Sequence, residues 1–350
     1  MATGRCQALF RARQCTDSVN VALGQKIYEE FNTVVILKKQ QRVTDPVWRD
    51  FLQHLRKGEV NTQHLVMLRT LIIGQPQHIP EELSSVHWRN APLITPRHAV
   101  RERWNSLAVR KECKLYVVVA QDTIRGRPLT LAERYALAVR NKNSGGQKDL
   151  PEKLEVAIGM KIMVTTNVET DLDITNRAQG EVVDIRLHPD EPVTMGCTVH
   201  LKYLPAYILV RLERTRASQL PGLPEAVLPL ETVSTAMQVK VETGDGKTSR
   251  TVKRQQFPLT AGYAFTDYRS QGQTIPYVLV DIMSPPPPGT LSLFNLYVVL
   301  SRSSGRGTIQ LLRDFDNKLF LQAHDTDLTA EDARLEDLNN STAEWWKNTK

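Results

Sequence analysis

Apolar positions along this chain follow two patterns, the spacing of amphipathic helices and the short runs of strands. These patterns divide the chain into regions of different expected secondary structure. Phe51, Leu52 and Leu55 follow Trp48 by three, four and seven residues, so they predict a helix with one apolar face after the capping sequence 44–46. Short apolar runs rich in β-branched residues predict strands, with further helices between them. This alternation predicts an α/β fold. The strands are expected at 31–37, 91–95 and 115–120, and the helices at 62–72 and 99–109.

A second texture occupies residues 158–256. Short runs of alternating or β-branched residues follow one another closely and are separated by turn-forming clusters such as 188–190 and 244–246. This spacing predicts a small β-barrel or sandwich inserted into the α/β domain. Alternating strand and helix patterns are found again at 257–315, and an amphipathic terminal helix is expected at 329–346.

Charge narrows the class of partner. The net charge is +7, although the stretch from Lys318 to Lys350 holds seven acidic and four basic residues, so the rest of the chain is strongly basic. A basic body favours a polyanion as partner. No apolar run is long enough to span a membrane, and the first residues lack the apolar core of a secretory signal, which predicts an intracellular protein. The scattered Cys6, Cys15, Cys113 and Cys197 are expected as thiols rather than as metal ligands.

Two motifs carry the candidate chemistry. The first, Y-A-F-T-D-Y-R-S-Q-G-Q-T-I at 263–275, follows a basic stretch and gathers short hydrogen-bonding side chains at 270–274. Such side chains can bind sugar and phosphate groups without reading base edges. The second, L-Y-V-V-L-S-R-S-S-G-R-G at 296–307, places Arg302 after a β-branched run that reads as a strand, from which one guanidinium could be aimed at a phosphate. Arg42 occupies the matching place after the expected strand at 31–37.

Three other stretches resemble nucleotide- or metal-binding sites. Gly246-Lys247-Thr248 suggests a phosphate-binding loop, but the position five residues before Gly246 is Val241 rather than glycine, and a hairpin turn is favoured. Asp122 and Asp281 each follow an apolar run, as a magnesium-binding carboxylate can, yet neither is followed by a second acid. We expect both to be solvated turn residues, and no metal site is predicted.

In this order, the two motifs resemble the last two motifs of PIF-type (RecD-like) superfamily 1 ATP-dependent DNA helicases. The stretch 158–183 also resembles the entry of that family into its inserted β-barrel, with Arg177 where the family usually has glycine. Tyr268-Arg269 stands where the family typically has His-Lys. The resemblance covers about residues 25–346 and rests on the order of several stretches rather than on any single one.

The resemblance implies the C-terminal half of such an enzyme. In that family ATP binds between two RecA-like domains, and the first supplies the phosphate loop and the acids that hold Mg²⁺. This chain resembles the second domain. The expected fold is α/β, with a RecA-like parallel sheet flanked by helices, an inserted small β-barrel and a C-terminal helix. The domains would be a remnant of a preceding domain at 1–27, the RecA-like domain at 28–157 plus 257–320, the barrel at 158–256 and the helix at 321–350.

The resemblance also implies roles for individual residues. Arg302 and Arg42 would act as arginine fingers on the γ-phosphate of ATP. ATP and Mg²⁺ would serve the complete enzyme, and this chain alone would bind neither strongly and be inactive. Its partners would be single-stranded DNA and the missing first domain, in DNA repair or recombination, in the nucleus or mitochondria of a eukaryote. The residues implied to contact DNA are Lys253, Arg254, Thr266, Tyr268, Arg269, Ser270, Gln271, Gly272 and Thr274.

Two alternatives remain. The chain could be a non-enzymatic module that binds single-stranded DNA or another partner and retains the helicase fold. It could also be an unrelated α/β enzyme with a β insert, but no constellation of nucleophile and base supports that hypothesis. A phosphate-loop sequence encoded upstream in the same reading frame would favour the helicase.

Overall fold

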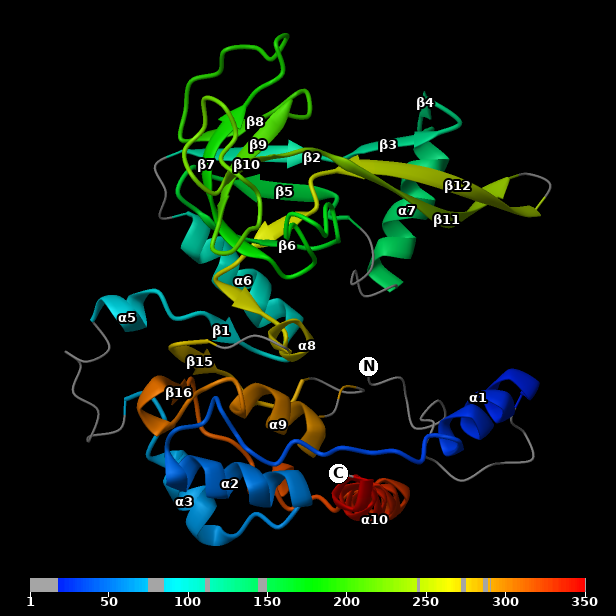
Figure 1. Cartoon of the computed structure of the whole chain (residues 1–350). Helices are drawn as coiled ribbons and strands as arrows, with labels where there is room; N and C mark the ends of the chain where they lie inside the picture. Colours follow the sequence, from blue (N-terminus) through cyan, green and yellow to red (C-terminus); the bar gives the residue numbers. More distant parts are fainter. Residues whose placement is uncertain are drawn as a thin grey trace. The chain divides into compact units, whose positions relative to one another are not determined.

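A computed structural model describes residues 18–74, 85–110, 114–143, 150–243, 246–271, 275–285, 289 and 291–349 (Figure 1). The chain divides into two compact units, residues 1–89 with 270–350 and residues 90–269. Among the described residues, no helix combines the length and apolar character needed to span a membrane. Of the four cysteines, Cys197 is exposed with a free thiol, and the other three lie outside the described residues.

The first unit contains mostly helices and one parallel pair of strands. Its core includes Trp48 and Phe51, whose ring centroids are 5.0 Å apart, and Phe320 packs on Phe51. The strands β15 and β16 pair in parallel, with Val278 opposite Ile309. The elements are α1 (Val19–Glu29), α2 (Pro46–Lys57), α3 (Thr62–Arg69), α5 (Val86–Arg89), β15 (Val278–Val280), α9 (Leu293–Leu300), β16 (Ile309–Leu311) and α10 (Thr326–Thr349).

Local sequence explains the ends of α2 as predicted. The Asp45 side chain caps the first turn by accepting hydrogen bonds from the N–H groups of Val47 and Trp48 at 3.0 and 3.3 Å. Gly58 ends the helix in the left-handed conformation, with φ of 74°, which glycine adopts without steric cost. The apolar face then buries Trp48 and Leu55 completely.

Two strand predictions in this unit are wrong. Residues 31–37 form no strand: they are extended, and side chains of α10 bind their backbone, since Val34 N–H donates to Thr342 and Ile36 N–H to Asn339. The run that precedes Arg302 is the helix α9, because Ser292 and Asn295 form a reciprocal cap at its start. Burial of its apolar residues outweighs the β propensity of the valines.

The second unit is dominated by β-sheet. A parallel pair joins β1 to β14, with Leu93 opposite Ala264. The other strands form a five-stranded antiparallel sheet (β10-β9-β7-β6-β13), a four-stranded sheet (β11-β12-β3-β4) and a three-stranded sheet (β5-β2-β8). The strands are β1 (Leu93–Ile94), β2 (Leu115–Val119), β3 (Gln121–Ile124), β4 (Arg127–Pro128), β5 (Lys153–Val156), β6 (Lys161–Val164), β7 (Gln179–Arg186), β8 (Thr198–His200), β9 (Tyr207–Leu212), β10 (Val227–Leu230), β11 (Val233–Thr243), β12 (Gly246–Gln256), β13 (Leu259–Ala261) and β14 (Ala264–Phe265), and the helices are α6 (His98–Val109), α7 (Leu131–Asn143) and α8 (Asp267–Ser270).

The strand pairing of this unit reaches beyond the expected insert. Strand β2 pairs with β8, and β3 pairs with β12, so residues before 158 contribute strands to the same sheets as residues 198–200 and 233–256. The domain limits given above stay predictions. The α/β class with parallel strands is confirmed, because β1 and β14 and, in the other unit, β15 and β16 pair in parallel.

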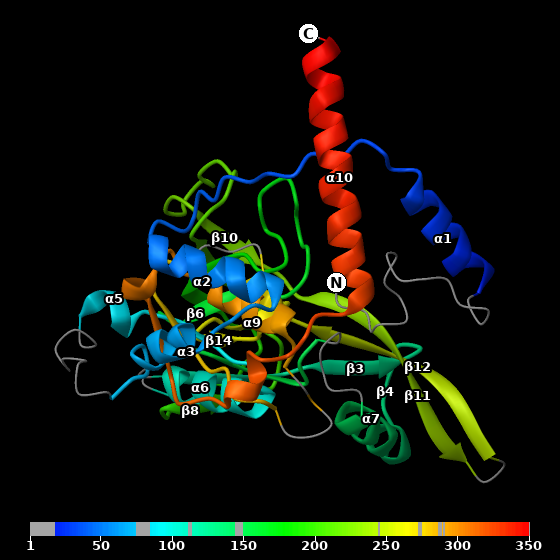
Figure 2. The same ribbon diagram turned by 90° about the horizontal axis from the view of Figure 1, so that it is seen from below.

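The β11–β12 hairpin is the longest strand pairing among the described residues (Figure 2). Its register runs from Val233 opposite Gln256 to Thr243 opposite Gly246, so the residues after Gly246 form a strand and not the helix that follows a phosphate loop. One face of the hairpin packs on α7 through a small separate core that includes Leu137 and Met237. The hairpin interpretation of Gly246-Lys247-Thr248 is therefore confirmed.

The side chain of Asn105 fixes α6 beside β14. Its amide nitrogen donates to the carbonyl oxygen of Ala264 at 2.9 Å, and its amide oxygen accepts from the N–H of Ala264 at 2.7 Å. Both residues are buried. The short α8 follows β14 almost directly, so these two hydrogen bonds position the segment that carries Tyr268 and Arg269 relative to α6.

Candidate functional site

Arg302 lies at the end of α9 and is only 8% exposed. Its guanidinium donates hydrogen bonds to the carbonyl oxygens of Val298 at 2.7 Å and Ser270 at 3.5 Å, and to Ser301 Oγ at 2.8 Å. This arrangement holds the side chain against the last turn of α9. The predicted position at the end of a rigid element is therefore found, although the element is a helix.

Arg42 lies beside Arg302. Its Nη1 donates to the Ser301 carbonyl oxygen at 3.2 Å, at the C-terminal cap of α9. Burial, and then the charge of Arg42, lower the pKa of Arg302 to about 10. Arg302 still carries its charge at neutral pH, so two positive charges are held close together. Such a concentration of like charge in a partly buried place is typical of an anion-binding site.

The two sequence motifs meet at Arg302. Its side chain donates to the Ser270 carbonyl oxygen, and its own carbonyl oxygen accepts from the N–H of Ile275 at 3.4 Å. Gly272 and Thr274, which were predicted to contact DNA, lie outside the described residues. Ser270 and Ile275, which flank these residues in the sequence, are therefore both hydrogen-bonded to Arg302.

The turn after Arg302 is fixed by an ion pair that the sequence did not reveal. Arg306 Nε donates to Asp45 Oδ2 at 2.7 Å, and Asp45 also caps α2. A Cβ on Gly305 would lie 2.7 Å from the Asp45 Cβ, so only glycine fits between the two segments. The hydrogen bond from Arg306 lowers the pKa of Asp45 from 3.8 to about 2.

Replacing Asp45 by asparagine tests this ion pair, because asparagine keeps the capping group. The pKa of Asp45 is lowered in the folded state, so its contribution is present above the unfolded pKa and is lost as pH falls through the range from 3.8 to about 2. Since the Arg306 side chain is 42% exposed, we expect a loss of only ~1 kcal/mol at neutral pH. Thermal melting of both proteins should show a difference that narrows below about pH 4. A constant difference would contradict the assignment.

Arg254 does not face solvent, in contrast to its predicted role in DNA contact. It is 2% exposed and makes a bidentate ion pair with Asp122, with both distances 2.8 Å, and a hydrogen bond to the Leu150 carbonyl oxygen. We therefore assign it a structural role. The expectation that Asp122 and Asp281 are solvated is also wrong: Asp122 pairs with Arg254, and the buried Asp281 pairs with Arg313 at 3.3 Å. An apolar run followed by one acid gives no information about a distant arginine partner.

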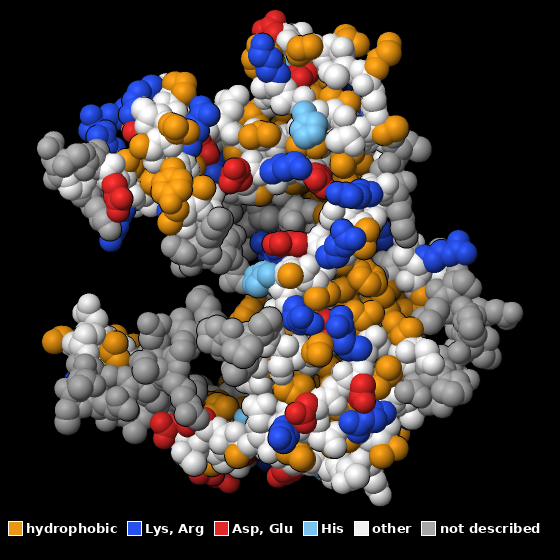
Figure 3. Space-filling model, turned by 180° about the vertical axis from the view of Figure 1, so that it is seen from behind, with side chains coloured by type: hydrophobic (Ala, Val, Ile, Leu, Met, Phe, Trp, Pro, Cys, Tyr) orange, Lys and Arg blue, Asp and Glu red, His pale blue; other side chains and the backbone are white. Residues whose placement is uncertain are grey.

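The remaining candidates differ in accessibility. Thr266 and Ser270 are buried, so their side chains face the interior. Tyr268 is 41% exposed, and Gln271 and, on β12, Lys253 are exposed. Basic, acidic and apolar side chains are interspersed on the face drawn in Figure 3. Binding of a polyanion there would consequently depend on particular clusters rather than on a uniformly basic surface.

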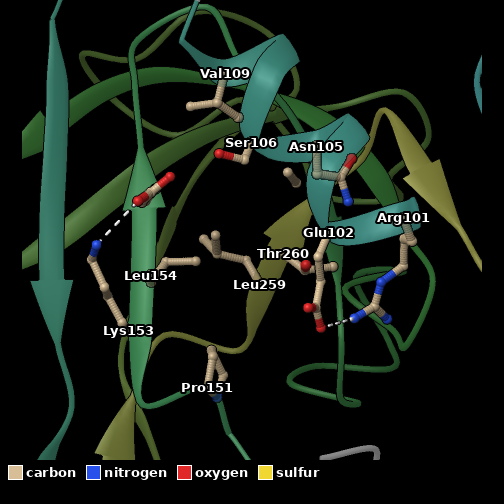
Figure 4. Close-up of a pocket in the computed structure, with 12 residues that line it drawn as sticks. Arg101, Glu102, Asn105, Ser106, Val109, Pro151, Lys153, Leu154, Leu259 and Thr260 are labelled. Carbon is tan, nitrogen blue, oxygen red and sulfur yellow. Dashed lines mark hydrogen bonds and ion pairs between the residues drawn. The ribbon is translucent and has the colours of Figure 1, made fainter. Parts of the chain in front are cut away.

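Arg269 is half-buried on α8. Burial lowers its pKa, and the charges of Arg101 and Arg177 lower it further. Arg101 also lines a cavity of about 230 Å³ between α6, β5 and β13, where it pairs with Glu102 at 3.2 Å (Figure 4). Three guanidinium groups from separate parts of the second unit therefore influence one another. The sequence pointed to Arg269 only.

Among the described residues, the donor atoms of Asp50, His54 and His64 lie within 4.8 Å of one another, as metal ligands can. However, His64 Nδ1 accepts the N–H of Asn61 at 3.3 Å, which leaves the proton of a neutral ring on Nε2, facing Asp50 Oδ2 at 3.3 Å. His54 Nδ1 lies 2.9 Å from the Asp50 carbonyl oxygen, where it donates. The nitrogens that face Asp50 therefore carry protons, and the group serves as a hydrogen-bonded cap between α2 and α3.

No family model matches this sequence, and no curated protein does. Solved structures do match. A structure of Bacteroides Pif1 bound to ssDNA has 18% identity and a TM-score of 0.59 over 91% of this chain and 64% of that chain. Bacteroides Pif1 with ADP-AlF3 and ssDNA has 17% identity and a TM-score of 0.58 over 94% of this chain and 66% of that chain. Pif1 helicase from Candida albicans has 20% identity and a TM-score of 0.55 over 84% of this chain and 59% of that chain.

These matches define the class of fold. The chain has the α/β fold of the Pif1 helicase structures that it matches, as predicted from its motifs. It spans about three fifths of the length of the Pif1 chains that it matches, between 59% and 66% in the three described above. At these identities the likeness concerns the fold, and activity is a separate question.

Proposed function

We propose that this chain is the C-terminal part of an ATP-dependent DNA helicase of the PIF type. In this role it contributes contacts to single-stranded DNA and arginine fingers to ATP hydrolysis. The fold supports the proposal, since two of the matching Pif1 structures contain single-stranded DNA and one of these also contains ADP-AlF3. The observation that carries it is the meeting of the two motifs at Arg302.

Arg302 is suited to act on a transferring phosphoryl group. Its guanidinium now donates to two carbonyl oxygens and a hydroxyl, which are neutral acceptors. A phosphate oxygen forms stronger, charge-assisted hydrogen bonds with the same fork. Engaging a γ-phosphate would release the Ser270 carbonyl oxygen, and this would loosen one end of the segment proposed to contact DNA. The geometry thus offers a way for binding of the γ-phosphate to change the affinity for single-stranded DNA.

The phosphate loop and the Mg²⁺-binding acids would come from a first RecA-like domain. The sequence of this chain contains no G-x-x-x-x-G-K-[ST], and the carboxylates of Asp122 and Asp281 are engaged by arginines. We therefore propose that ATP hydrolysis requires that domain, and that this chain alone binds neither ATP nor Mg²⁺ strongly.

A second function is a non-enzymatic module that binds single-stranded DNA. The burial of Arg302 favours it, because a side chain with three hydrogen bonds inside its own unit can be purely structural. The two functions differ in the effect of Arg302 on ATP turnover, but both require DNA binding.

Single-stranded DNA binding is tested by fluorescence anisotropy with a labelled oligonucleotide at several salt concentrations. We expect weak binding that falls steeply with salt, since affinity comes mostly from released counterions. Tyr268→Ala should weaken binding by ~1–3 kcal/mol with an unchanged salt slope, because the exposed ring can stack on a base. Tyr135→Ala is the matched control, since Tyr135 on α7 is 72% exposed. Absence of binding by the unaltered chain at low salt would remove both functions.

A further inference from the structure

The cavity between α6, β5 and β13 has an apolar inner wall (Figure 4). The side chains of Val109, Leu154 and Leu259 form this wall, and each residue is at most 5% exposed and belongs to the same apolar core. The volume of about 230 Å³ is below the roughly 300–1,000 Å³ of pockets for drug-sized ligands. The cavity can therefore accept one small group rather than a large ligand.

Two ion pairs lie at the solvent-facing side of the cavity, which we call its mouth. Arg101 Nη2 is 3.2 Å from Glu102 Oε1 on α6, and Lys153 Nζ is 3.1 Å from Glu155 Oε1 on β5. The Glu102 and Lys153 side chains are 69% and 51% exposed. Since two carboxylates match two cations, the mouth carries no excess charge that would select a free ion or a phosphate. We therefore expect the group that enters the cavity to be neutral.

Two hydroxyl groups lie in the same walls. Ser106 on α6 and Thr260 on β13 line the cavity, and Figure 4 shows the Ser106 hydroxyl directed into it. Neither hydroxyl hydrogen-bonds to another residue in the described part of the chain. The walls thus combine oxygen atoms of hydroxyls and carboxylates with an apolar surface. A ligand that matches them has an apolar face and hydrogen-bonding groups, donors above all, along its edge.

The helix α6 joins this cavity to the segment proposed to contact DNA. Asn105 lines the cavity, and its side-chain amide makes the two hydrogen bonds to Ala264 described above. Ala264 begins β14, and the helix α8 that follows carries Tyr268, whose ring is 41% exposed. The cavity and the aromatic ring proposed to stack on a base are therefore held by one helix within the same unit. This connection favours DNA over a protein side chain as the ligand.

We infer that the cavity binds one base of single-stranded DNA turned out of the stack, and that it prefers a base with an exocyclic amino group. The apolar wall would contact the ring, and the amino group would donate to the carboxylates of Glu102 and Glu155, as the amino group of cytosine can to an acidic side chain. An aliphatic side chain of a partner protein would leave the oxygen atoms unmatched. The inference rests on the proposed DNA-binding function and adds selection of a base to it.

The preference for a base is measured with two labelled oligonucleotides of equal length, oligo(dC) and oligo(dT), slightly above neutral pH. Both bases are pyrimidines, but thymine has a carbonyl oxygen where cytosine has its amino group. We expect the full chain to bind oligo(dC) about 5- to 10-fold more tightly, which is at the lower end of what one base contact contributes. Equal affinities would overturn the base site and leave DNA binding standing. Absence of binding to either oligonucleotide would overturn both.

Replacing the two carboxylates tests their assigned role. Glu102→Met combined with Glu155→Met keeps the length of the side chains but removes the acceptors, so the preference should fall below about 2-fold. Affinity for both oligonucleotides should rise, because two negative charges are lost. Glu152→Met with Glu181→Met is the matched control, since both are exposed acids of the same unit outside the cavity. The control should keep the preference. A preference that survives the first pair, or that disappears with the second, would overturn the base site.

Filling the cavity gives an independent test. Ser106→Leu adds volume from α6 and should abolish the preference, whereas Leu107→Phe adds volume at an exposed position of the same helix and should keep it. Melting curves show which variants are folded. If Ser106→Leu does not fold, the carboxylate variants still decide the result. A folded Ser106→Leu variant with the full preference for oligo(dC) would place the selective contact elsewhere and overturn the inference.

Two small molecules distinguish a base from a protein side chain as the ligand. Deoxycytidine at high concentration should reduce the preference for oligo(dC), since the free nucleoside occupies the cavity. N-acetyltyrosinamide, which carries the side chain of a tyrosine, should have no effect. If N-acetyltyrosinamide removes the preference and deoxycytidine does not, the cavity is a site for a protein side chain and the inference is overturned.

Discussion

Arg302→Ala is expected to lower ATP turnover at least ~10²-fold when this chain is joined to a RecA-like domain that carries a phosphate loop. The guanidinium would stabilise charge that develops on the γ-phosphoryl group, and alanine offers nothing in its place. Binding of single-stranded DNA should fall much less than turnover, because the substitution removes one hydrogen bond to the Ser270 carbonyl oxygen but no expected contact with DNA. The measurements are steady-state ATP hydrolysis with saturating DNA, and anisotropy on the same protein.

Variants at other positions make this result specific. Arg302→Lys keeps the charge but loses the planar fork, so it should recover part of the turnover. Arg56→Ala, which removes an exposed arginine of α2, should leave turnover unchanged. Because Arg302 is buried, a melting curve must show that the alanine variant is folded. A folded variant with full turnover would assign Arg302 a structural role and favour the non-enzymatic module.

Asp122→Ala is expected to destabilise the second unit by ~3–5 kcal/mol, because it leaves the Arg254 guanidinium buried without its carboxylate. For a unit of this size the melting temperature should fall by roughly 10 °C. Urea unfolding followed by circular dichroism gives the free energy directly. Asp171→Ala, at an exposed position of the same unit, is the control and should have almost no effect.

The paired replacement distinguishes a structural ion pair from a DNA contact. Asp122→Leu combined with Arg254→Met should recover most of the lost stability, since apolar side chains of similar volume can replace a buried pair. If Arg254 has no part in DNA binding, the recovered protein should bind single-stranded DNA with the original salt slope. A flatter slope in a fully folded double variant would return Arg254 to the DNA interface.

Sequence reasoning succeeded where local rules determine structure. The helix α2 follows from its cap at Asp45, its apolar face and Gly58, all within one stretch of chain. It failed at 31–37 and at the run before Arg302. A short apolar run rich in β-branched residues does not by itself distinguish a strand from a buried helix or an irregular segment. The hydrogen bonds that decide these cases come from α10 for the first segment and from the Ser292 cap for the second.

The candidate site divides in the same way. The sequence indicated Arg302 and the segment near Ser270 as parts of two motifs with separate roles, and the structure brings them into contact. The ion pair of Arg254 with Asp122 joins residues that are 132 positions apart, which no local pattern could show. Arg177 was visible as an arginine in place of glycine, but its left-handed backbone conformation required the fold.

The two hydrogen bonds between Asn105 and Ala264 have a consequence for association between molecules. A strand at the margin of a sheet offers unpaired N–H and C=O groups to which another chain can add, and this favours aggregation. The Asn105 carboxamide occupies one such pair on β14, with the donor and the acceptor that a neighbouring strand would supply. The Asn105 side chain therefore takes the place of a neighbouring strand at Ala264. A second molecule cannot pair with the strand edge at that position.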